Sequence, residues 1–486
     1  MRPRWYLLTL LALLTIPALY VATMAHGLVL GDPTEYTLVA HVLGIAHPPG
    51  YAFITVVGKL FQTLVPIGSI PWRMHLLAAT GATVAAVCVY LTLVALGRGL
   101  RVAAPGDGAL AGLFGALGVA FAATVWQHAI HTNPHILTAA FLAANLFLLT
   151  RWWASGDDEE AARDDRWLYG AAFLSGLGVT HHPLTVFSAP AYLVFVVAVR
   201  PRLWRRPRTL LWLGAAILLG LSLFLYYPLR SPMRPLFGPD DMNTLSGFLD
   251  HVLARGLSES LPFFGLADQP RRAIVFWSLL RLQYTLPVIL VAVVGFGWLA
   301  RRQWRLGLFY GLAFLGNYAF VISLRAQDIM AYLLGPFIVV GLLAGVGVLA
   351  LLHLMRQRLA PGTALGLLLA ALFLLGPVLQ VVRNLPAISL REYDEGDAYV
   401  EAVFDRFAGS GEGAVLLNDW EHMTPLWYAR FVEGRWPDER DVRPEFVSTE
   451  RPWLESVFAY LPGGPVYLNS YRREIVDAGF RLRPRG

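Results

Sequence analysis

Long apolar stretches fill most of the chain up to about residue 383, and short polar segments separate them. A helix that crosses a membrane needs about 20 predominantly apolar residues in succession, and stretches of this kind recur along the sequence. The pattern predicts eleven such helices, at residues 5–30, 73–97, 108–127, 136–152, 167–181, 183–199, 209–228, 280–299, 307–324, 331–353 and 364–383. We therefore expect a mainly α, polytopic transmembrane helical bundle.

The segment 50–66 is also apolar, but it is shorter and contains Lys59 and Gln62. Basic residues in short loops mark the cytoplasmic side of a membrane protein. If 50–66 lies along the outer surface, the arginine-rich loops and the N-terminus all fall on the cytoplasmic side. If it crosses the membrane, most of these loops change sides. We therefore expect 50–66 to remain outside, with the first loop, residues 31–72, and the C-terminal segment.

The tail from residue 384 differs from the rest because Asp, Glu and Arg occur throughout it. Its pattern predicts a buried strand at Ala414–Leu417, a helix over Thr424–Val432 and another strand at Pro465–Asn469. The sequence thus predicts a transmembrane domain at 1–383, followed by a small extracytoplasmic α/β domain at 384–486.

Composition excludes a wholly soluble chain. In this chain 56% of the residues are hydrophobic and only 15% are charged, whereas about a quarter of the residues of a typical soluble protein are charged. The net charge of +6 lies largely in short loops, which indicates membrane topology and not nucleic-acid binding. The lone cysteine, Cys88, allows neither an intrachain disulfide nor a cysteine metal cluster. The strong bias to arginine over lysine indicates a bacterial chain, and hence the bacterial inner membrane.

The candidate chemistry lies in the first outer loop, which contains Asp32-Pro33-Thr34-Glu35 and, further on, Gly44-Ile45-Ala46-His47-Pro48-Pro49-Gly50-Tyr51. Two readings of the carboxylates are open. Asp32 can cap a helix that starts at Pro33, with Glu35 favouring its dipole. Alternatively, the carboxylates perform acid–base chemistry at the membrane surface.

The acidic pair, the His-Pro-Pro-Gly turn, Gly58-Lys59 and Trp72-Arg73 together resemble the GT-C superfamily of membrane glycosyltransferases. Within it they resemble the bacterial branch of the transmembrane protein 260-like protein O-mannosyltransferase family, glycosyltransferase family 117. Gly44 to Tyr51 matches the family motif without change, whereas the middle residues of the acidic motif depart from it. The resemblance covers roughly residues 25–100, and weaker similarities lie at Gly178–Pro183, Tyr227–Arg230, Asp328, Tyr332 and Leu417–Tyr428.

The resemblance implies an inverting enzyme that moves a sugar, such as mannose, from a polyprenyl-phosphate donor to an acceptor hydroxyl outside the cytoplasm. The acceptor would be a protein Ser/Thr or a glycan, and the other partners would be membrane lipids and no nucleic acid. Asp32 would be the catalytic base, and Glu35 would orient hydroxyl groups or tune Asp32 through like-charge coupling.

The leaving phosphate needs positive charge or strong hydrogen-bond donors. Candidates for phosphate binding are Lys59, Arg73, Arg230, Arg281 and Arg325, with His47 and His182 as further hydrogen-bond donors. The residues expected to line the site are His47, Tyr51, His181, His182, Asp328 and Tyr332. Lys59 can equally be an interfacial lysine that extends toward water, and Arg73 can simply anchor its helix. We expect the two carboxylates to share one outer cavity with at least one of Arg73, Arg230, Arg281 and Arg325.

His128, His131 and His135 have a spacing that suits one helical face, but Pro134 interrupts the helix there. We therefore favour histidines that line a polar cavity and expect no metal or other cofactor.

A transporter or flippase of lipid-linked sugars is the alternative function, and it would need charges or broken helices near the middle of the membrane. The polar groups gather on one face instead, which favours an enzyme. A scaffold without activity would leave the paired carboxylates unexplained.

Overall fold

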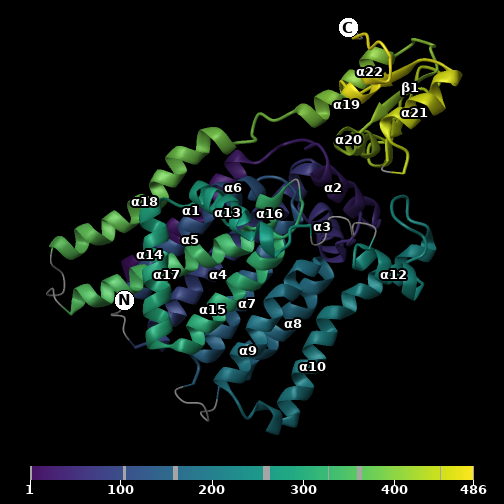
Figure 1. The fold of residues 1–486 in the computed structure, drawn as a ribbon. Coiled ribbons are helices and arrows are strands. Elements are labelled where there is room, and N and C mark those ends of the chain that lie inside the picture. The colour runs from purple at the N-terminus through teal and green to yellow at the C-terminus, as the bar shows by residue number, and fades with distance from the viewer. Residues whose placement is uncertain are drawn as a thin grey trace.

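The computed structural model describes residues 3–101, 106–156, 163–255, 263–326, 328–357, 364–448 and 450–484. A large helical body carries a small α/β unit at one end, and Figure 1 shows this unit in yellow beside the first helices. The longer helices of the body are α1 Pro3–Thr23, α4 Ile70–Gly99, α5 Asp107–Ala120, α7 Pro134–Trp153, α8 Asp165–His181, α9 Ala189–Val199, α10 Pro207–Leu221, α13 Gln269–Gln283, α14 Leu286–Arg302, α15 Trp304–Ile322, α17 Leu334–Arg356 and α18 Ala364–Ile388.

Short helices connect these elements, and α2 among them lies beside the small unit (Figure 1). The α-helices among them are α2 Asp32–Val42, α3 Ala52–Leu64, α6 Ala123–Ala129, α11 Tyr226–Arg230, α12 Leu245–Val252 and α16 Ile329–Tyr332. The 3-10 turns of the body are η1 Pro183–Ser188, η2 Leu203–Arg205, η3 Ser222–Leu225, η4 Ser231–Met233 and η6 Leu266–Asp268.

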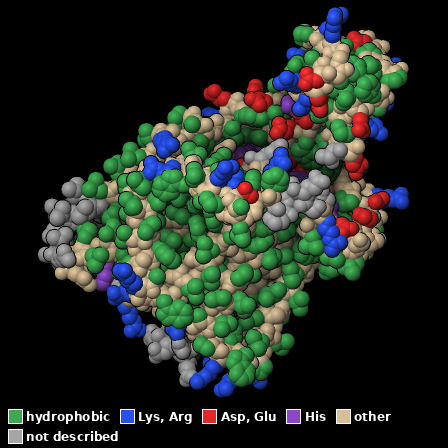
Figure 2. All heavy atoms as spheres, viewed as in Figure 1, with side chains coloured by type: hydrophobic (Ala, Val, Ile, Leu, Met, Phe, Trp, Pro, Cys, Tyr) green, Lys and Arg blue, Asp and Glu red, His purple; other side chains and the backbone are tan. Residues whose placement is uncertain are grey.

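The chain is a multi-pass membrane protein by the length and composition of its helices. Within the described residues, five helices are long and apolar enough to cross a membrane, or up to seven if each of two bent helix pairs is one span. Four shorter apolar helices accompany them, at Leu7–Thr23, Ala52–Leu64, Pro183–Val199 and Leu372–Ile388. The number of eleven spans therefore stays a prediction. Hydrophobic side chains cover the visible face of the body, as a surface in contact with lipid requires (Figure 2).

Helix α17 forms the centre of the body, and almost all of its residues are buried. It approaches α14 so closely that a Cβ atom on Gly347 would lie only 2.0 Å from the carbonyl oxygen of Val291. Small residues of this kind let helix backbones come together in membranes, where burial of apolar side chains drives association little.

The segment 50–66 forms α3, whose 13 residues extend only about 20 Å. This is too short to cross a hydrocarbon layer of about 30 Å. The first helix ends at Thr23 and not at residue 30 as expected. Residues 24–31 form a loop instead, because their backbone pairs with the small unit.

The small unit contains a parallel sheet of three strands in the order β2-β1-β3. Its elements are α19 Glu395–Phe407, β1 Ala414–Asn418, α20 Trp420–Phe431, β2 Val442–Phe446, α21 Trp453–Tyr460, η7 Leu461–Gly463, β3 Val466–Leu468 and α22 Arg473–Asp477. The central strand β1 is buried throughout and pairs Ala414 with Val442 and Val415 with Val466. Both predicted strands and the helix after the first are present, and α20 starts four residues earlier than expected. The domain boundary at residue 384 stays a prediction.

The small unit contacts the body through the loop that leads into α2. The backbone N–H of Leu28 donates to Asp397 Oδ2 at 2.9 Å, and that of Gly31 donates to the carbonyl of Glu421 at 3.0 Å. Thr424 Oγ1 donates to the carbonyl of Gly31 at 2.9 Å. These bonds hold α19 and α20 against the start of α2, where the paired carboxylates lie.

Candidate active site

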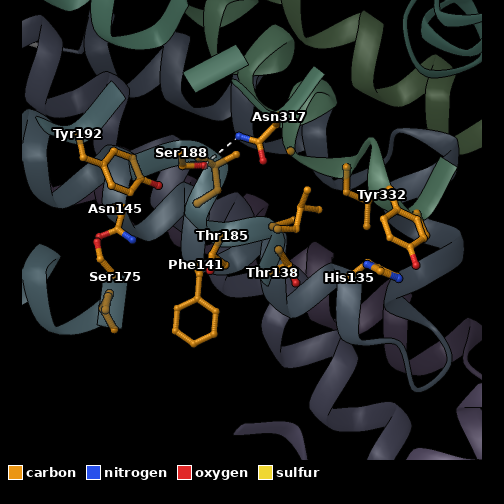
Figure 3. Close-up of a pocket in the computed structure, with 17 residues that line it drawn as sticks. His135, Thr138, Phe141, Asn145, Ser175, Thr185, Ser188, Tyr192, Asn317 and Tyr332 are labelled. Atoms are coloured by element: carbon orange, nitrogen blue, oxygen red, sulfur yellow. Dashed lines mark hydrogen bonds between the residues drawn. The ribbon is translucent and has the colours of Figure 1, made fainter. Parts of the chain in front are cut away.

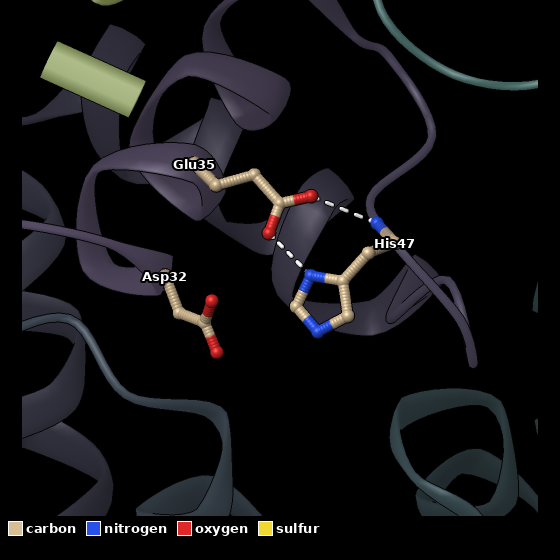
Figure 4. Close-up of side chains that lie close together, drawn as sticks. All are labelled: Asp32, Glu35 and His47. Carbon is tan, nitrogen blue, oxygen red and sulfur yellow. Dashed lines mark hydrogen bonds and ion pairs between the residues drawn. The ribbon is translucent and has the colours of Figure 1, made fainter. Parts of the chain in front are cut away.

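The two carboxylates occupy the first turn of α2, which begins at Asp32 directly after Gly31. Gly31 has φ +79°, a conformation that favours glycine, and no side chain caps the helix. The Asp32 carboxylate instead accepts a hydrogen bond from Trp420 Nε1 of the small unit at 2.6 Å. Figure 4 shows Asp32 and Glu35 directed toward the same space as His47. The structure therefore does not show the capping role considered for Asp32.

Glu35 is completely buried, and His47 satisfies both of its carboxylate oxygens. One oxygen accepts from the backbone N–H of His47 at 2.8 Å, and the other forms an ion pair with Nδ1 of the same residue (Figure 4). Burial opposes the charged form of His47, but the negative charges of Glu35 and then Asp32 outweigh it and raise the pKa of His47 to about 9. The imidazole is therefore protonated at neutral pH.

The Gly44–Tyr51 turn holds His47 in this position through contacts with later parts of the chain. Ile45 N donates to the carbonyl of Phe237 at 2.9 Å, and His251 Nε2 bonds the carbonyl of Ala46 at 2.9 Å. At Gly50, φ is +95° and an added Cβ would lie 2.6 Å from the hydroxyl of Tyr227. The motif thus requires glycine at this position and serves to present His47 to Glu35.

A wall of aromatic and histidine rings continues from His47 into the body. Tyr51 lies between His47 and His182, with 5.5 Å between ring centroids on either side. His182 then contacts His135 at 5.1 Å, and His135 contacts Tyr332 at 4.0 Å. His181, beside His182, contacts the Tyr51 ring at 6.0 Å and is buried.

Asp328 holds the end of this wall. Its carboxylate accepts from His128 Nε2 at 3.0 Å and caps the short helix α16, which carries Tyr332. Burial would raise the pKa of Asp328, but the hydrogen bond from His128 and its positive charge lower it. Of the residues expected to line the site, His47, Tyr51, His182, Tyr332 and Asp328 thus form one connected series.

Three of the five predicted phosphate ligands donate to backbone carbonyls. Lys59 Nζ donates to the carbonyl of His41 at 2.6 Å, and Arg230 Nε donates to that of Leu43 at 2.6 Å, so both satisfy the C-terminal end of α2. Arg73 Nη1 donates to the carbonyl of Gln62 at 2.6 Å, which fixes the connection between α3 and α4.

The other two predicted ligands are exposed. The guanidinium groups of Arg281 and Arg325 lie over the rings of Trp277 and Phe263, at 6.0 Å and 4.8 Å from their centroids. Within the described part of the chain, no ion pair joins any of the five cations to Asp32 or Glu35. The expected arginine beside the carboxylates is therefore not observed, and a phosphate role for these five residues stays a prediction.

Comparisons with known proteins find similar chains and similar folds. The family model described as the protein O-mannosyl-transferase TMEM260 N-terminal domain matches residues 32–205, which begin at Asp32 and include the His47 turn and His182. The chain is 27% identical to protein O-mannosyl-transferase TMEM260 of Mus musculus over 482 residues. It is 28% identical to the protein of the same description from Dictyostelium discoideum over 235 residues.

The match to the mouse protein covers 92% of this chain and 64% of the mouse protein, and that to the Dictyostelium protein covers 46% and 27%. The chain thus spans less than two thirds of the length of either relative.

Solved structures share the fold. ArnT from Cupriavidus metallidurans bound to undecaprenyl phosphate superposes with a TM-score of 0.54 at 14% identity, covering 99% of this chain and 91% of ArnT. The Archaeoglobus fulgidus oligosaccharyltransferase in complex with Zn and sulfate gives 0.51 at 14% identity, covering 88% and 62%. Residues 32–205 thus match the TMEM260 family model, and the chain has the fold of these solved structures.

The candidate site also contains residues that the sequence did not single out for it. Trp420 follows a buried strand 388 positions after Asp32, and no local signal links the two segments. His135 was considered only together with His128 and His131. The structure separates the three. The ring centroids of His128 and His131 are 5.6 Å apart, whereas His135 contacts Tyr332 instead.

One group of described residues offers ligand atoms close enough for a metal ion. Oxygen and nitrogen atoms of Asp32, Glu35 and His47 lie within 4.8 Å of one another. Both oxygens of Glu35, however, already accept hydrogen bonds from His47. A cation would have to displace the imidazole proton before the trio could bind it.

Proposed function

We propose that this chain transfers a sugar from a polyprenyl-phosphate donor to an acceptor hydroxyl on the non-cytoplasmic side of the membrane. The contrast between its two carboxylates carries the proposal. Glu35 is buried and paired with a cationic histidine, whereas Asp32 is exposed and has one oxygen without a partner among the described residues. Two neighbouring carboxylates in opposite environments are typical of a catalytic pair with divided roles.

In this mechanism Asp32 is the general base. Its free Oδ2 takes the proton of the acceptor hydroxyl while the hydroxyl oxygen attacks the anomeric carbon. The bond from that carbon to the phosphate oxygen breaks, its electron pair leaves with the phosphate, and the configuration inverts. Trp420 holds Oδ1, which fixes the direction of Oδ2. Glu35 and His47 support the first turn of α2 and keep the second carboxylate out of the reaction.

The names of the relatives support the choice of substrates. Two are described as protein O-mannosyl-transferases, which supports mannose as the sugar and protein Ser/Thr as the acceptor. The ArnT structure of similar fold contains undecaprenyl phosphate, which supports a polyprenyl carrier. We further propose that the chain acts in a bacterial inner membrane and without a metal ion, because His47 occupies the carboxylate that a cation would need.

Purified protein in nanodiscs, supplied with radiolabelled polyprenyl-phosphate mannose and envelope acceptors, tests the proposal. We expect Asp32→Asn to lower transfer at least about 100-fold, because the amide cannot accept the proton. Asp240→Asn, an equal change at an exposed position outside the site, should retain full transfer.

Equal transfer by the parent protein and Asp32→Asn would eliminate Asp32 as the base. Movement of the labelled carrier across liposomes without any transfer would favour the flippase function instead.

A further inference from the structure

Three side chains form a compact cluster at the far end of the ring wall that begins at His47. They are His135 at the start of α7, His182 between α8 and η1, and Tyr332 at the end of α16. His135 contacts His182 at 5.1 Å and Tyr332 at 4.0 Å between ring centroids. Burial, and then the negative charges of Asp32 and Asp328, raise the pKa of Tyr332 to about 12, so this cluster lies within electrostatic reach of the candidate base.

Each member of the cluster has a polar group that no described residue satisfies. The Nδ1 atom of His182 accepts the backbone N–H of Leu184 at 3.0 Å, which leaves the ring proton on Nε2 without an acceptor. The Nδ1 atom of His135 is buried without a partner. In the described part of the chain nothing accepts the hydroxyl proton of Tyr332. His135 and His182 are only 8% exposed, so bulk water does not supply the missing hydrogen-bond partners.

The surrounding chain holds these groups in place. His181 Nε2 donates to the carbonyl of Pro134 at 2.7 Å, which ties the end of α8 to the start of α7. Asn133 caps α7 by accepting the backbone N–H of His135 at 2.9 Å. Buried polar groups in native proteins almost always have partners, and donors fixed in place without one indicate a ligand.

We propose that His135, His182 and Tyr332 bind the phosphate of the lipid carrier and stabilise it as it leaves, an inference that rests on the proposed transfer. Three considerations favour a phosphate. The available groups are N–H and O–H donors, the positive end of the α7 dipole adds to them, and Lys59, Arg73 and Arg230 donate to backbone carbonyls instead.

The placement also fits an inverting displacement, in which the base and the leaving group lie on opposite sides of the anomeric carbon. The Tyr51 ring lies between His47 on the carboxylate side and His182 on the other. The sugar would occupy the space along Tyr51, with Asp32 beside the acceptor and the cluster beside the phosphate. When the bond from the anomeric carbon to oxygen breaks, the electron pair goes to the phosphate oxygen that the cluster contacts.

Binding of the bare carrier tests the inference without requiring transfer. Full-length protein in nanodiscs would be titrated with undecaprenyl phosphate and, separately, with undecaprenol, which lacks the phosphate. Tyr332→Phe removes only the hydroxyl, and His182→Asn retains an acceptor for Leu184 N–H while removing the distal N–H. We expect each change to weaken binding of undecaprenyl phosphate about tenfold and to leave undecaprenol binding unchanged.

Tyr192→Phe is the matched control, because Tyr192 lies at the opposite end of the cavity that His135 and Tyr332 line (Figure 3). It should bind both lipids like the parent protein. Unchanged binding of undecaprenyl phosphate by both test variants would overturn the inference, as would an equal loss for both lipids.

Asp32→Asn separates this inference from the proposed function. It should abolish transfer and still bind undecaprenyl phosphate. The parent protein could transfer no sugar while the cluster variants still bind undecaprenyl phosphate more weakly and undecaprenol normally. In that case the proposed transfer is wrong and the phosphate site is retained.

Discussion

Asp32 and Glu35 are one helical turn apart in sequence and yet have opposite surroundings. Glu35 points into the protein, where His47 donates to both oxygens, while Asp32 stays exposed and receives one indole N–H. A buried carboxylate is tolerated only with such a partner, because an unpaired buried charge is costly. The division of roles that we propose for the two acids thus follows from the position of His47.

The Glu35–His47 pair gives the protein a defined dependence on pH. Because folding raises the pKa of His47 from 6.5 to about 9, the stabilisation is complete below pH 6.5 and is lost as pH rises through 9. We expect the melting temperature, followed by intrinsic fluorescence, to fall between pH 7 and 9.5. His47→Gln should lower the free energy of unfolding by about 3 kcal/mol and flatten this slope.

His41→Gln is the control, because His41 contacts Gln62 and lies away from the carboxylates. It should retain the slope of the parent protein. An unchanged slope in His47→Gln would show that another group titrates.

Local motifs allowed the carboxylates, His47 and Tyr51 to be predicted together, since these residues are close in sequence and their spacing is informative. The contacts of Lys59 and Arg230 were beyond prediction for a physical reason. Both donate to backbone carbonyls. Every residue has a backbone carbonyl, so the sequence does not show which one will accept a hydrogen bond. A cation near a motif therefore identifies a charge but not its partner.

Helices α19 and α20 complete the site from the far end of the chain. Their contact with the loop before α2 depends on close approach, because a Cβ on Gly396 would lie 2.4 Å from the carbonyl oxygen of Leu28. The same interface carries the bond from Trp420 to Asp32.

We expect Gly396→Ala to separate α19 from Leu28, because backbone atoms cannot yield as a flexible side chain can. Transfer should fall about tenfold, because Asp32 would lose its hydrogen bond from Trp420. A hydrogen bond to a charged group is stronger than one between neutral groups. Limited proteolysis near residues 384–395 should become faster. Gly463→Ala, where an added Cβ meets nothing within 4 Å, should change neither measurement. Proteolysis and transfer like those of the parent protein would contradict this account of the interface.

Periodicity predicted the apolar helices well and the ends of elements less well. Strand β2 was missed because Arg443, Pro444 and Glu445 interrupt any apolar alternation, and it exists only because β1 pairs with it. The first helix was predicted seven residues too long for a related reason. Residues 24–30 are apolar enough to continue it, but the helix ends where the backbone of Leu28 and Gly31 bonds to Asp397 and Glu421 of the small unit. Long-range pairing of this kind is not encoded in local sequence.

The whole molecule separates its polar chemistry from its lipid-facing surface. The start of α2, which carries the carboxylates, contacts the small α/β unit. The long helices of the body extend away from that unit (Figure 1). The arginine-rich ends of α14 and α17 lie at the opposite side of the body (Figure 1). This polarity follows the distribution of basic loops and supports one orientation in the membrane.

Accessibility of single cysteines tests that orientation in intact cells. Glu439→Cys, on the small unit, should react with a membrane-impermeant maleimide added from outside. Arg302→Cys, at the end of α14, should react only after the inner membrane is permeabilised. Both positions are exposed, and the parent protein should stay unlabelled because Cys88 is buried. The reverse pattern would invert the topology and place the carboxylates in the cytoplasm.

The bond between Trp420 and Asp32 has a consequence for how the protein is made. A ribosome delivers Asp32 first and its indole partner only after 388 further residues. Until α20 has folded onto the loop before α2, the Asp32 carboxylate lacks its hydrogen bond from Trp420. In the proposed mechanism, chains in which α20 is still missing would therefore transfer sugar poorly, and the lipid-linked sugar would not be consumed before α20 is in place.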